Sequence, residues 1–200
     1  MRIIESVQGT PEWLQSRLGC PSGSKFDSLI TATGKPSASA ETYINQLIAE
    51  LLTGETTYVP TTEWMARGTE LEPMARDYYT LATGNEVEEV GFCKHDRLEA
   101  GVSPDGIIGS DGLIEIKCPA PATHVAYLRG GRLPTKYKQQ VQGQMWITDR
   151  AWCDFVSYHE SMPALITRVE RDQAYIDLLA AEVEKAVETI QTQYQKLKEL

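Results

Sequence analysis

The segment from Ser103 to Pro119 constrains the fold more than any other part of the chain. It reads Ser-Pro-Asp-Gly-Ile-Ile-Gly-Ser-Asp-Gly-Leu-Ile-Glu-Ile-Lys-Cys-Pro, so two turn signals alternate with two short apolar runs. Alternate residues of a strand share one face, which puts Glu115 and Lys117 side by side. Their apolar neighbours indicate an interior strand, where two charged side chains are costly without partners or a metal ion. The segment therefore predicts a hairpin that carries a charged site.

Asp105 is the third charged residue of this expected site. It lies in a turn between two strands, and the hairpin folds it back toward Glu115 and Lys117. Two carboxylates with a lysine beside them form a hard oxygen site suited to Mg²⁺, with the ammonium near an attacking water. A Glu-x-Lys triplet alone is common by chance, and Asp105 alone could belong to an ordinary turn. The interior strand and the upstream Pro-Asp pair favour a site for phosphodiester hydrolysis.

Capping and turn signals divide the rest of the chain into expected elements. Helices are expected from Pro11 to Gly19, Ser24 to near Gly34, Ser39 to Gly54, Thr62 to Leu81, Pro121 to Arg129, Thr135 to Ile147 and from Asp172 onward. Strands are expected at Glu86–Lys94, Ala100–Val102, Ile107–Ile108, Leu113–Lys117, Trp152–His159 and Ala164–Glu170. Ser24 is expected to cap its helix, and Gly68 and Pro73 to kink or divide theirs. This order of elements predicts an α+β or mixed α/β fold.

The composition is that of an ordinary globular chain, with 42% hydrophobic and 24% charged residues. We expect one domain over residues 1–200, because neither a repeat nor a Pro/Gly/Ser-rich linker divides the sequence. An apolar run long enough for a membrane span or an export signal is missing, so we expect a soluble chain without membrane contact. The four cysteines are widely separated, which predicts reduced, buried thiols rather than a zinc or iron–sulfur site.

The distribution of charge bears on nucleic-acid binding. The net charge of −9 opposes it, because Lys and Arg supply most of the affinity for phosphates. However, one segment holds four cations and no acidic residue: Arg129, Arg132, Lys136 and Lys138. A basic groove on an acidic body is therefore feasible, although a solvated basic loop explains the same segment. The three histidines lack the spacing of a nucleophile–base pair or a metal site, which favours structural or surface roles.

Five ordered blocks run through nearly the whole chain. They are Trp13-x-x-x-Arg17-x-Gly19 with Ser24, Gly68-x-x-x-Glu72-x-x-Ala75-Arg76, Ser103-Pro104-Asp105-Gly106, Glu115-x-Lys117-Cys118-Pro119, and Tyr137-x-x-Gln140-Val141-Gln142-x-x-Met145-Trp146. Together they resemble the PD-(D/E)xK nucleases, and more closely their phage lambda exonuclease or YqaJ-type viral recombinase branch. The resemblance implies a restriction-endonuclease-like core, in which helices flank a central mixed sheet.

The resemblance also implies a metal site and its ligands. In the family, the aspartate of Pro-Asp and the glutamate of Glu-x-Lys bind Mg²⁺, which here are Asp105 and Glu115. The backbone carbonyl of Ile116 is a further expected ligand. Glu72 matches a helix glutamate that completes the acidic cluster, with a solvated helix charge as the alternative. Two ions are expected, and Mn²⁺ is the alternative metal.

Catalytic and substrate contacts follow from the same resemblance. Lys117 matches the lysine that orients or activates the attacking water, and Gln140 the residue that contacts the scissile phosphate or that water. Tyr137 matches a family tyrosine beside the site. The family's pocket for a 5′-phosphate is matched by Arg17, Ser24 and Ser103. The family has a further arginine where this chain has Thr123, and His124 or Arg129 are the candidates to replace it.

The activity implied is a Mg²⁺-dependent 5′→3′ exonuclease that degrades one strand of linear duplex DNA. It would release 5′-mononucleotides and leave a 3′ overhang for recombination by single-strand annealing. The resemblance implies a homo-oligomeric ring trimer around DNA, a single-strand annealing protein as partner, and a phage or prophage protein in the bacterial cytoplasm. The candidate channel-lining residues are Arg129, Arg132, Lys136 and Lys138. The alternatives are a structure-specific or restriction-type endonuclease, and a non-enzymatic DNA-end-binding scaffold.

Overall fold

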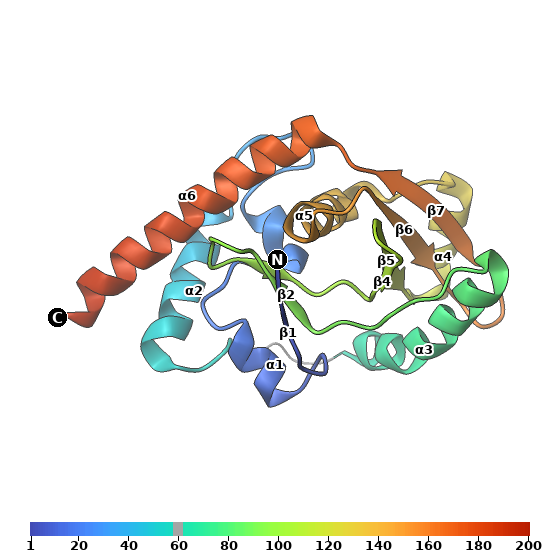
Figure 1. Cartoon of the computed structure of the whole chain (residues 1–200), viewed down its shortest axis with the longest axis horizontal. Coiled ribbons are helices and arrows are strands. Elements are labelled where there is room, and N and C mark those ends of the chain that lie inside the picture. Colours follow the sequence, from blue (N-terminus) through green and yellow to red (C-terminus); the bar gives the residue numbers. More distant parts are fainter. Residues whose placement is uncertain (58–61) are drawn as a thin grey trace.

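A computed structural model describes residues 1–57 and 62–200 (Figure 1). The strands are β1 (Arg2–Ile4), β2 (Phe92–Lys94), β3 (Gly101–Val102), β4 (Gly106–Ile108), β5 (Gly112–Lys117), β6 (Trp152–Ser157) and β7 (Leu165–Glu170). The α-helices are α1 (Pro11–Ser16), α2 (Ala40–Thr53), α3 (Glu63–Thr83), α4 (Pro121–Gly130), α5 (Lys138–Thr148) and α6 (Gln173–Lys198). Two 3₁₀ helices are η1 (Gly23–Ser28) and η2 (Thr135–Tyr137).

The larger sheet has the strand order β4-β5-β6-β7 and is mixed, because β5 and β6 run parallel while both outer pairs are antiparallel. Its strand β5 is buried on both faces, as the apolar flanks of Glu115 predict. Ile114 and Ile116 pack with α3, whereas Leu113 packs with α5. Helices thus flank a central mixed sheet, and the expected α+β fold is confirmed.

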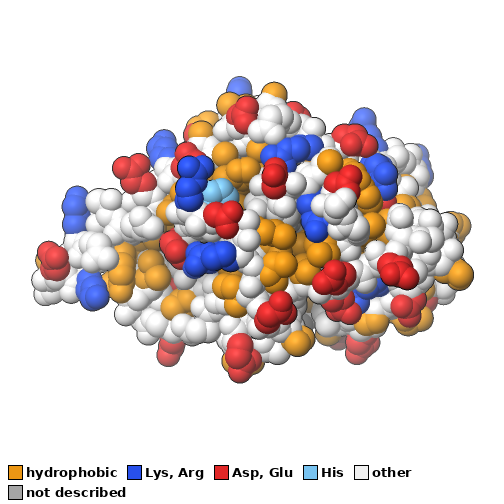
Figure 2. All heavy atoms as spheres, in the orientation of Figure 1, with side chains coloured by type: hydrophobic (Ala, Val, Ile, Leu, Met, Phe, Trp, Pro, Cys, Tyr) orange, Lys and Arg blue, Asp and Glu red, His pale blue; other side chains and the backbone are white. Residues whose placement is uncertain are grey.

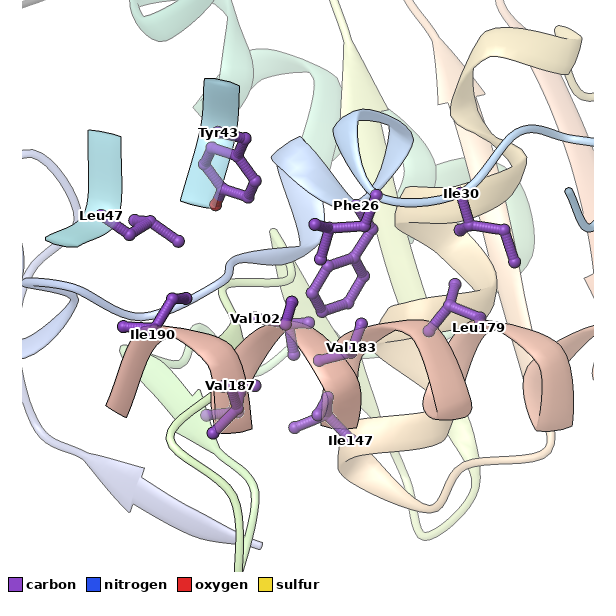
Figure 3. Packing of buried hydrophobic residues seen from close by; sticks show 14 of the residues in the cluster. Phe26, Ile30, Tyr43, Leu47, Val102, Ile147, Leu179, Val183, Val187 and Ile190 are labelled. Atoms are coloured by element: carbon purple, nitrogen blue, oxygen red, sulfur yellow. The ribbon is translucent and has the colours of Figure 1, made fainter. Parts of the chain in front are cut away.

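The smaller sheet (Figure 1) has the order β1-β2-β3 and contributes Cys93 and Val102 to a second core. Figure 3 shows side chains of η1, α2 and α6 meeting there, with Phe26, Val102, Ile147 and Val183 at the centre. Tyr43 and Leu47 enter from α2, at the spacing that an amphipathic helix predicts. This core anchors η1 next to α5 and α2 next to α6, and α5 also packs on the larger sheet.

Several expected elements differ in extent. Of Glu86–Lys94 only β2 is a strand, because the segment passes from one sheet to the other: Glu88 bridges Ile107 of β4, and Phe92 pairs with Ile4 of β1. β1 was not expected from the sequence. Helix α3 continues through Gly68 and Pro73, so a division into two pieces is wrong. Packing against the larger sheet keeps α3 continuous at Pro73, since Leu71 before it and Ala75 after it are both buried there.

The expected helix from Ser24 to Gly34 is also wrong. The element is the six-residue η1, and Ser22 rather than Ser24 stands at its N-cap, without a side-chain capping bond. It ends because Leu29 and Ile30 turn into the core. Thr10, Thr62 and Asp172 do cap their helices with side-chain oxygens. Within residues 1–57 and 62–200, the helices lack the combination of length and apolar character that a membrane crossing needs.

Candidate active site

The β4–β5 hairpin brings Asp105 against the edge of β5. Its Oδ2 accepts a hydrogen bond of 2.6 Å from the backbone N–H of Ile116. The N–H and C=O of one strand residue point to the same side, so the Ile116 carbonyl faces Asp105 as well. Gly106 lets the segment around Val87 approach the start of β4, since a Cβ there would lie 2.2 Å from Cγ1 of Val87. The hairpin therefore places a carboxylate and a carbonyl oxygen at one edge of the sheet.

Glu115 lies on the face of β5 that α5 covers and is fully buried. Gln140 donates to its Oε1 and Gln144 to its Oε2, each over 2.6 Å. Lys117 forms an ion pair with Oε1 from the same face of the strand. Three donors from two elements thus hold one carboxylate, which fixes the direction in which its remaining lone pairs point.

The electrostatics of the site follow from burial and from the nearness of like charges. Burial, and then the negative charge of Glu115, raise the pKa of Asp105 well above its usual range. Burial also raises the pKa of Glu72, and Arg76 and Lys117 offset this only in part. For Lys117, burial lowers the pKa, but Glu115 and Asp105 more than reverse this, so its pKa lies above the ordinary value and the ammonium stays charged.

Glu72 approaches this group from α3. Its carboxylate pairs with Arg76 at 3.0 Å, and Arg76 also pairs with Glu89 at 2.7 Å. In the part of the chain that the structure describes, three Asp, Glu, His or Cys side chains are nowhere close enough together to hold a metal ion. The predicted ligands Glu72, Asp105 and Glu115 are therefore neighbours rather than a formed coordination shell.

The donor set nevertheless fits a hard divalent cation. All the donors are oxygens, from two carboxylates on the hairpin, the Ile116 carbonyl and Glu72. Burial and neighbouring carboxylates raise the pKa values of Asp105 and Glu72, so further positive charge beside them would favour their ionised forms. A divalent cation would supply that charge and leave the carboxylates ionised.

A single cleft of about 1420 Å³ joins Asp105 and Glu72 to Arg17 and Ser24. Its walls come from α1, η1, α2 and α3 and from the loop before α1. Figure 2 shows that acidic side chains predominate over the lower part of the drawn face, where Figure 1 places α1 and α3. The cleft lining itself combines basic with acidic side chains: Arg17, Lys25 and Arg76 with Glu5, Glu50, Glu72, Glu89 and Asp105.

Arg17 is held by its neighbours rather than extended into solvent. Its guanidinium carbon lies 4.0 Å from the centre of the Trp13 ring, and its Nη2 donates to Ser22 Oγ over 3.0 Å. Trp13 in turn donates from Nε1 to Ser103 Oγ over 3.0 Å. Burial lowers the pKa of Arg17, with Tyr43 and Glu50 opposing that shift.

Ser24 is exposed on η1 and reaches the site from another direction. With Lys136, Tyr137 and Gln140 it lines a second hollow of about 170 Å³. η1 approaches α5 closely because Gly143 has no side chain: a Cβ there would lie 2.4 Å from Cδ2 of Phe26. Ser24 therefore borders both the Arg17 cleft and the Gln140 side of the site.

Of the four cations in the basic segment, Lys136 lines one of the two hollows of the site. Arg129 and Arg132 are exposed and outside the residues that line the two hollows. Lys136 lies 4.7 Å from the Tyr137 ring centre. Lys138 pairs with Asp172 at 3.3 Å and stacks on Tyr175, so its charge is used within the fold.

The candidate replacement of the family arginine by His124 is wrong. His124 is fully buried, and its ring nitrogens lie 2.7 Å from Ser157 Oγ and 2.9 Å from the Pro163 carbonyl. Thr123, its neighbour on α4, is half-buried. The histidine thus joins α4 to the end of β6, in the structural role that its lack of motif spacing predicts.

Gln144 and Ser22 are contacts that the sequence reasoning missed. Gln144 stands four residues after Gln140, so both lie on one face of α5. That spacing was the signal that could have found it. Ser22 was overlooked because Ser24, two residues later, matched the motif.

The four cysteines are free and buried, as expected.

Comparison with known proteins gives concordant matches. The model of the YqaJ-like viral recombinase domain matches residues 12–151. A search of the curated proteins gives no significant match. The crystal structure of an alkaline exonuclease, LHK-Exo, from Laribacter hongkongensis is 39% identical, covers 95% of this chain and 97% of its own, and has a TM-score of 0.87.

Two further structures belong to this comparison. LHK-Exo in complex with dAMP matches with 39% identity and a TM-score of 0.86, over 95% of this chain and 97% of that one. A phage-related exonuclease from Haemophilus somnus 129PT is 16% identical, with a TM-score of 0.72, over 89% of this chain and 96% of that one. At that identity the second likeness shows the fold alone.

Proposed function

The chain belongs to the family of YqaJ-like viral recombinase domains, and from that premise we propose that it is a divalent-metal-dependent 5′→3′ exonuclease on the ends of duplex DNA. The family match and the similarity to an alkaline exonuclease support the coarser statement, a recombination-related exonuclease. The metal, the direction of digestion and the 3′ overhang are our proposal.

One observation carries the proposal: the contact of Asp105 with the Ile116 N–H, directly beside the buried Glu115–Lys117 pair. This contact gathers oxygen ligands and a charged ammonium around one strand edge. Burying a carboxylate costs free energy, and here two amide donors and an ammonium offset that cost and fix its orientation. Phosphodiester hydrolysis uses both kinds of group.

Each side chain has a distinct proposed task. Asp105, Glu115, the Ile116 carbonyl and Glu72 would hold Mg²⁺, as one or two ions, with Mn²⁺ as the alternative. Bound there, the metal supplies Lewis-acid polarisation of the scissile phosphate and a lowered pKa for an adjacent water. Lys117, held charged by its carboxylate neighbours, orients the attacking water. Gln140 fixes Glu115 on one side and faces the substrate on the other, next to Tyr137.

The proposed direction of digestion rests on Arg17. It lies in the same cleft as Asp105, and its guanidinium is the kind of group that binds a terminal phosphate through paired hydrogen bonds. Ser103 and Ser24 are the proposed hydroxyl partners. LHK-Exo was solved in complex with dAMP, which supports a deoxynucleotide as the kind of ligand proposed for this chain.

The proposal extends to assembly. A ring trimer would enclose duplex DNA and let a chain of net charge −9 remain bound. Arg129 and Arg132 are the proposed channel-lining cations, as both are exposed near the end of α4. A single-strand annealing protein is the proposed partner, which would receive the 3′ overhang.

The test follows product size over time. Linear duplex DNA labelled at the 5′ end of one strand is incubated with the protein and Mg²⁺, and a parallel sample carries a 3′ label. Our proposal expects the 5′ label to appear at once as a mononucleotide, while the 3′-labelled strand shortens progressively. Asp105→Asn is the matched inactive protein.

Covalently closed circular DNA separates the alternatives. An exonuclease leaves it intact, whereas a structure-specific or restriction-type endonuclease linearises it. Early release of the 3′ label would reverse the proposed polarity. DNA-end binding without any hydrolysis, in Mg²⁺ and in Mn²⁺, would leave only the scaffold function.

A further inference from the structure

Trp13 occupies an unusual place in the cleft, because it contacts two of the residues proposed to bind the terminal phosphate. The helix cap fixes its backbone, since Thr10 Oγ1 accepts from the Trp13 N–H over 3.3 Å. Its ring face carries the guanidinium of Arg17, 4.0 Å from the ring centre. Its ring nitrogen donates to Ser103 Oγ, which belongs to the turn before Asp105.

The ring face controls how Arg17 presents its donors. A guanidinium that lies over a ring face can still donate from the N–H groups at its edge. One of them is used by Ser22 Oγ, over 3.0 Å. Stacking also removes much of the rotational freedom of a long side chain, a loss that would otherwise accompany ligand binding.

The ring nitrogen controls the direction of the Ser103 hydroxyl. A serine hydroxyl has one donor and two acceptor positions. Because Trp13 has an N–H and no acceptor, Ser103 must accept in this contact and keeps its only O–H donor free. A free donor is what an anionic phosphate oxygen requires.

We propose that Trp13 is the positioning residue of the terminal-phosphate subsite, aligning Arg17 through its face and Ser103 through its nitrogen. It acts through these two residues and needs no contact with the nucleotide. This inference rests on the proposed function, because it assigns the part that prepares the phosphate contact. Tryptophan supplies both a ring face and a ring N–H donor, whereas phenylalanine supplies only the ring face.

The test measures the ratio of digestion rates on two duplexes that differ only in a 5′-phosphate or a 5′-hydroxyl end. Trp13→Phe keeps a ring face for Arg17 and loses the N–H, so we expect the ratio to fall about fivefold, as for one lost hydrogen bond. Trp13→Leu removes both contacts, and the ratio should approach one. The affinities of both duplexes are measured by fluorescence anisotropy in Ca²⁺, without turnover. The preference for the 5′-phosphate end should fall in the same order, from wild type to Trp13→Phe to Trp13→Leu.

A double-mutant cycle distinguishes a role of Trp13 in positioning Ser103 from a role in supporting the fold alone. Ser103→Ala should lower the preference for a 5′-phosphate end by the same factor as Trp13→Phe. The double variant should lower it little more than either single variant does. The matched control is Trp152→Phe, since Trp152 also carries a stacked arginine, Arg168 at 3.6 Å, but on β6 and β7 away from the cleft. Its phosphate ratio should equal that of the wild type.

The outcomes distinguish this inference from the proposed function. A wild-type ratio near one would remove the phosphate subsite itself. A clear wild-type preference that survives in Trp13→Leu would overturn the role of Trp13 alone. So would equal slowing of both substrates, with the ratio unchanged, because a merely structural residue behaves in that way.

Discussion

The side-chain amide of Gln144 donates a 2.6 Å hydrogen bond to Oε2 of Glu115, and neither side chain is exposed to solvent. The bond crosses from α5 to β5 and fixes the oxygen that the opposite donor, Gln140, does not reach. The direction of the proposed metal ligand thus depends on a residue that does not itself face the cleft. The first prediction tests this dependence.

Gln144→Leu should lower activity about tenfold and stability by about 1–3 kcal/mol, because a buried carboxylate oxygen loses its donor. Hydrolysis rates and urea unfolding measure the two effects. Gln142→Leu is the matched control: it is buried on the same helix and donates to the Glu170 carbonyl instead. It should lose stability and keep its activity per folded molecule. Full activity in Gln144→Leu would show that Gln140 and Lys117 suffice to orient Glu115.

Lys117→Ala should reduce hydrolysis more than a hundredfold, since it removes the ammonium that orients water. It also leaves Glu115 without its cation, so the melting temperature should fall. Lys117→Arg keeps a positive charge beside Glu115 and should retain stability, yet remain inactive because the guanidinium has a different shape. Lys185→Ala, on the exposed side of α6, is the control. Residual turnover within about tenfold of wild type would contradict the catalytic role.

Asp105→Asn and Asp105→Ala separate the two tasks of this side chain. The amide oxygen of asparagine can still accept from the Ile116 N–H, so Asp105→Asn should keep the hairpin and its stability. Both variants should bind Mg²⁺ or Mn²⁺ at least tenfold more weakly in calorimetric titrations, because the ligand charge is gone. Asp111→Asn, in the other turn of the same hairpin, should bind metal normally. Unchanged metal affinity in Asp105→Asn would mean that Asp105 is not a ligand.

Local patterns predicted the helices with strong caps and the interior strand. Thr10, Thr62 and Asp172 stand where a capping oxygen is needed, and each makes its bond. Glu115 and Lys117 share a face because strand periodicity requires it. These features depend on residues near one another in the sequence, so reading the sequence sufficed.

Features that depend on distant contacts were not predictable. β1 is three residues long and pairs with β2 some ninety positions later, so its own sequence carries little signal. Arg150 looks like an ordinary charge after α5. In the structure it is buried and donates to the Gly109 and Gly112 carbonyls, which closes the turn of the β4–β5 hairpin. Such a role appears only once the two segments are placed together.

Gly143→Ala tests whether the close approach of η1 to α5 serves the site. A methyl group there would meet the ring of Phe26, whose Cδ2 would lie 2.4 Å from the new Cβ. Because Phe26 is fully buried, the ring cannot swing into solvent. We expect a loss of about 1–3 kcal/mol in the free energy of unfolding, as for an overpacked core.

The same substitution should move Ser24 away from Gln140, since η1 carries both Phe26 and Ser24. Activity should therefore fall at temperatures where the variant is still folded, by circular dichroism. Gly130→Ala, at the end of α4 with open space around its Cβ position, is the matched control and should be neutral or stabilising by up to about 1 kcal/mol. Adding Phe26→Leu to Gly143→Ala should cost less than the two single losses together, because the smaller side chain makes room for the methyl group. Additive losses would show that Gly143 and Phe26 do not constrain each other, and the close approach would then need another cause.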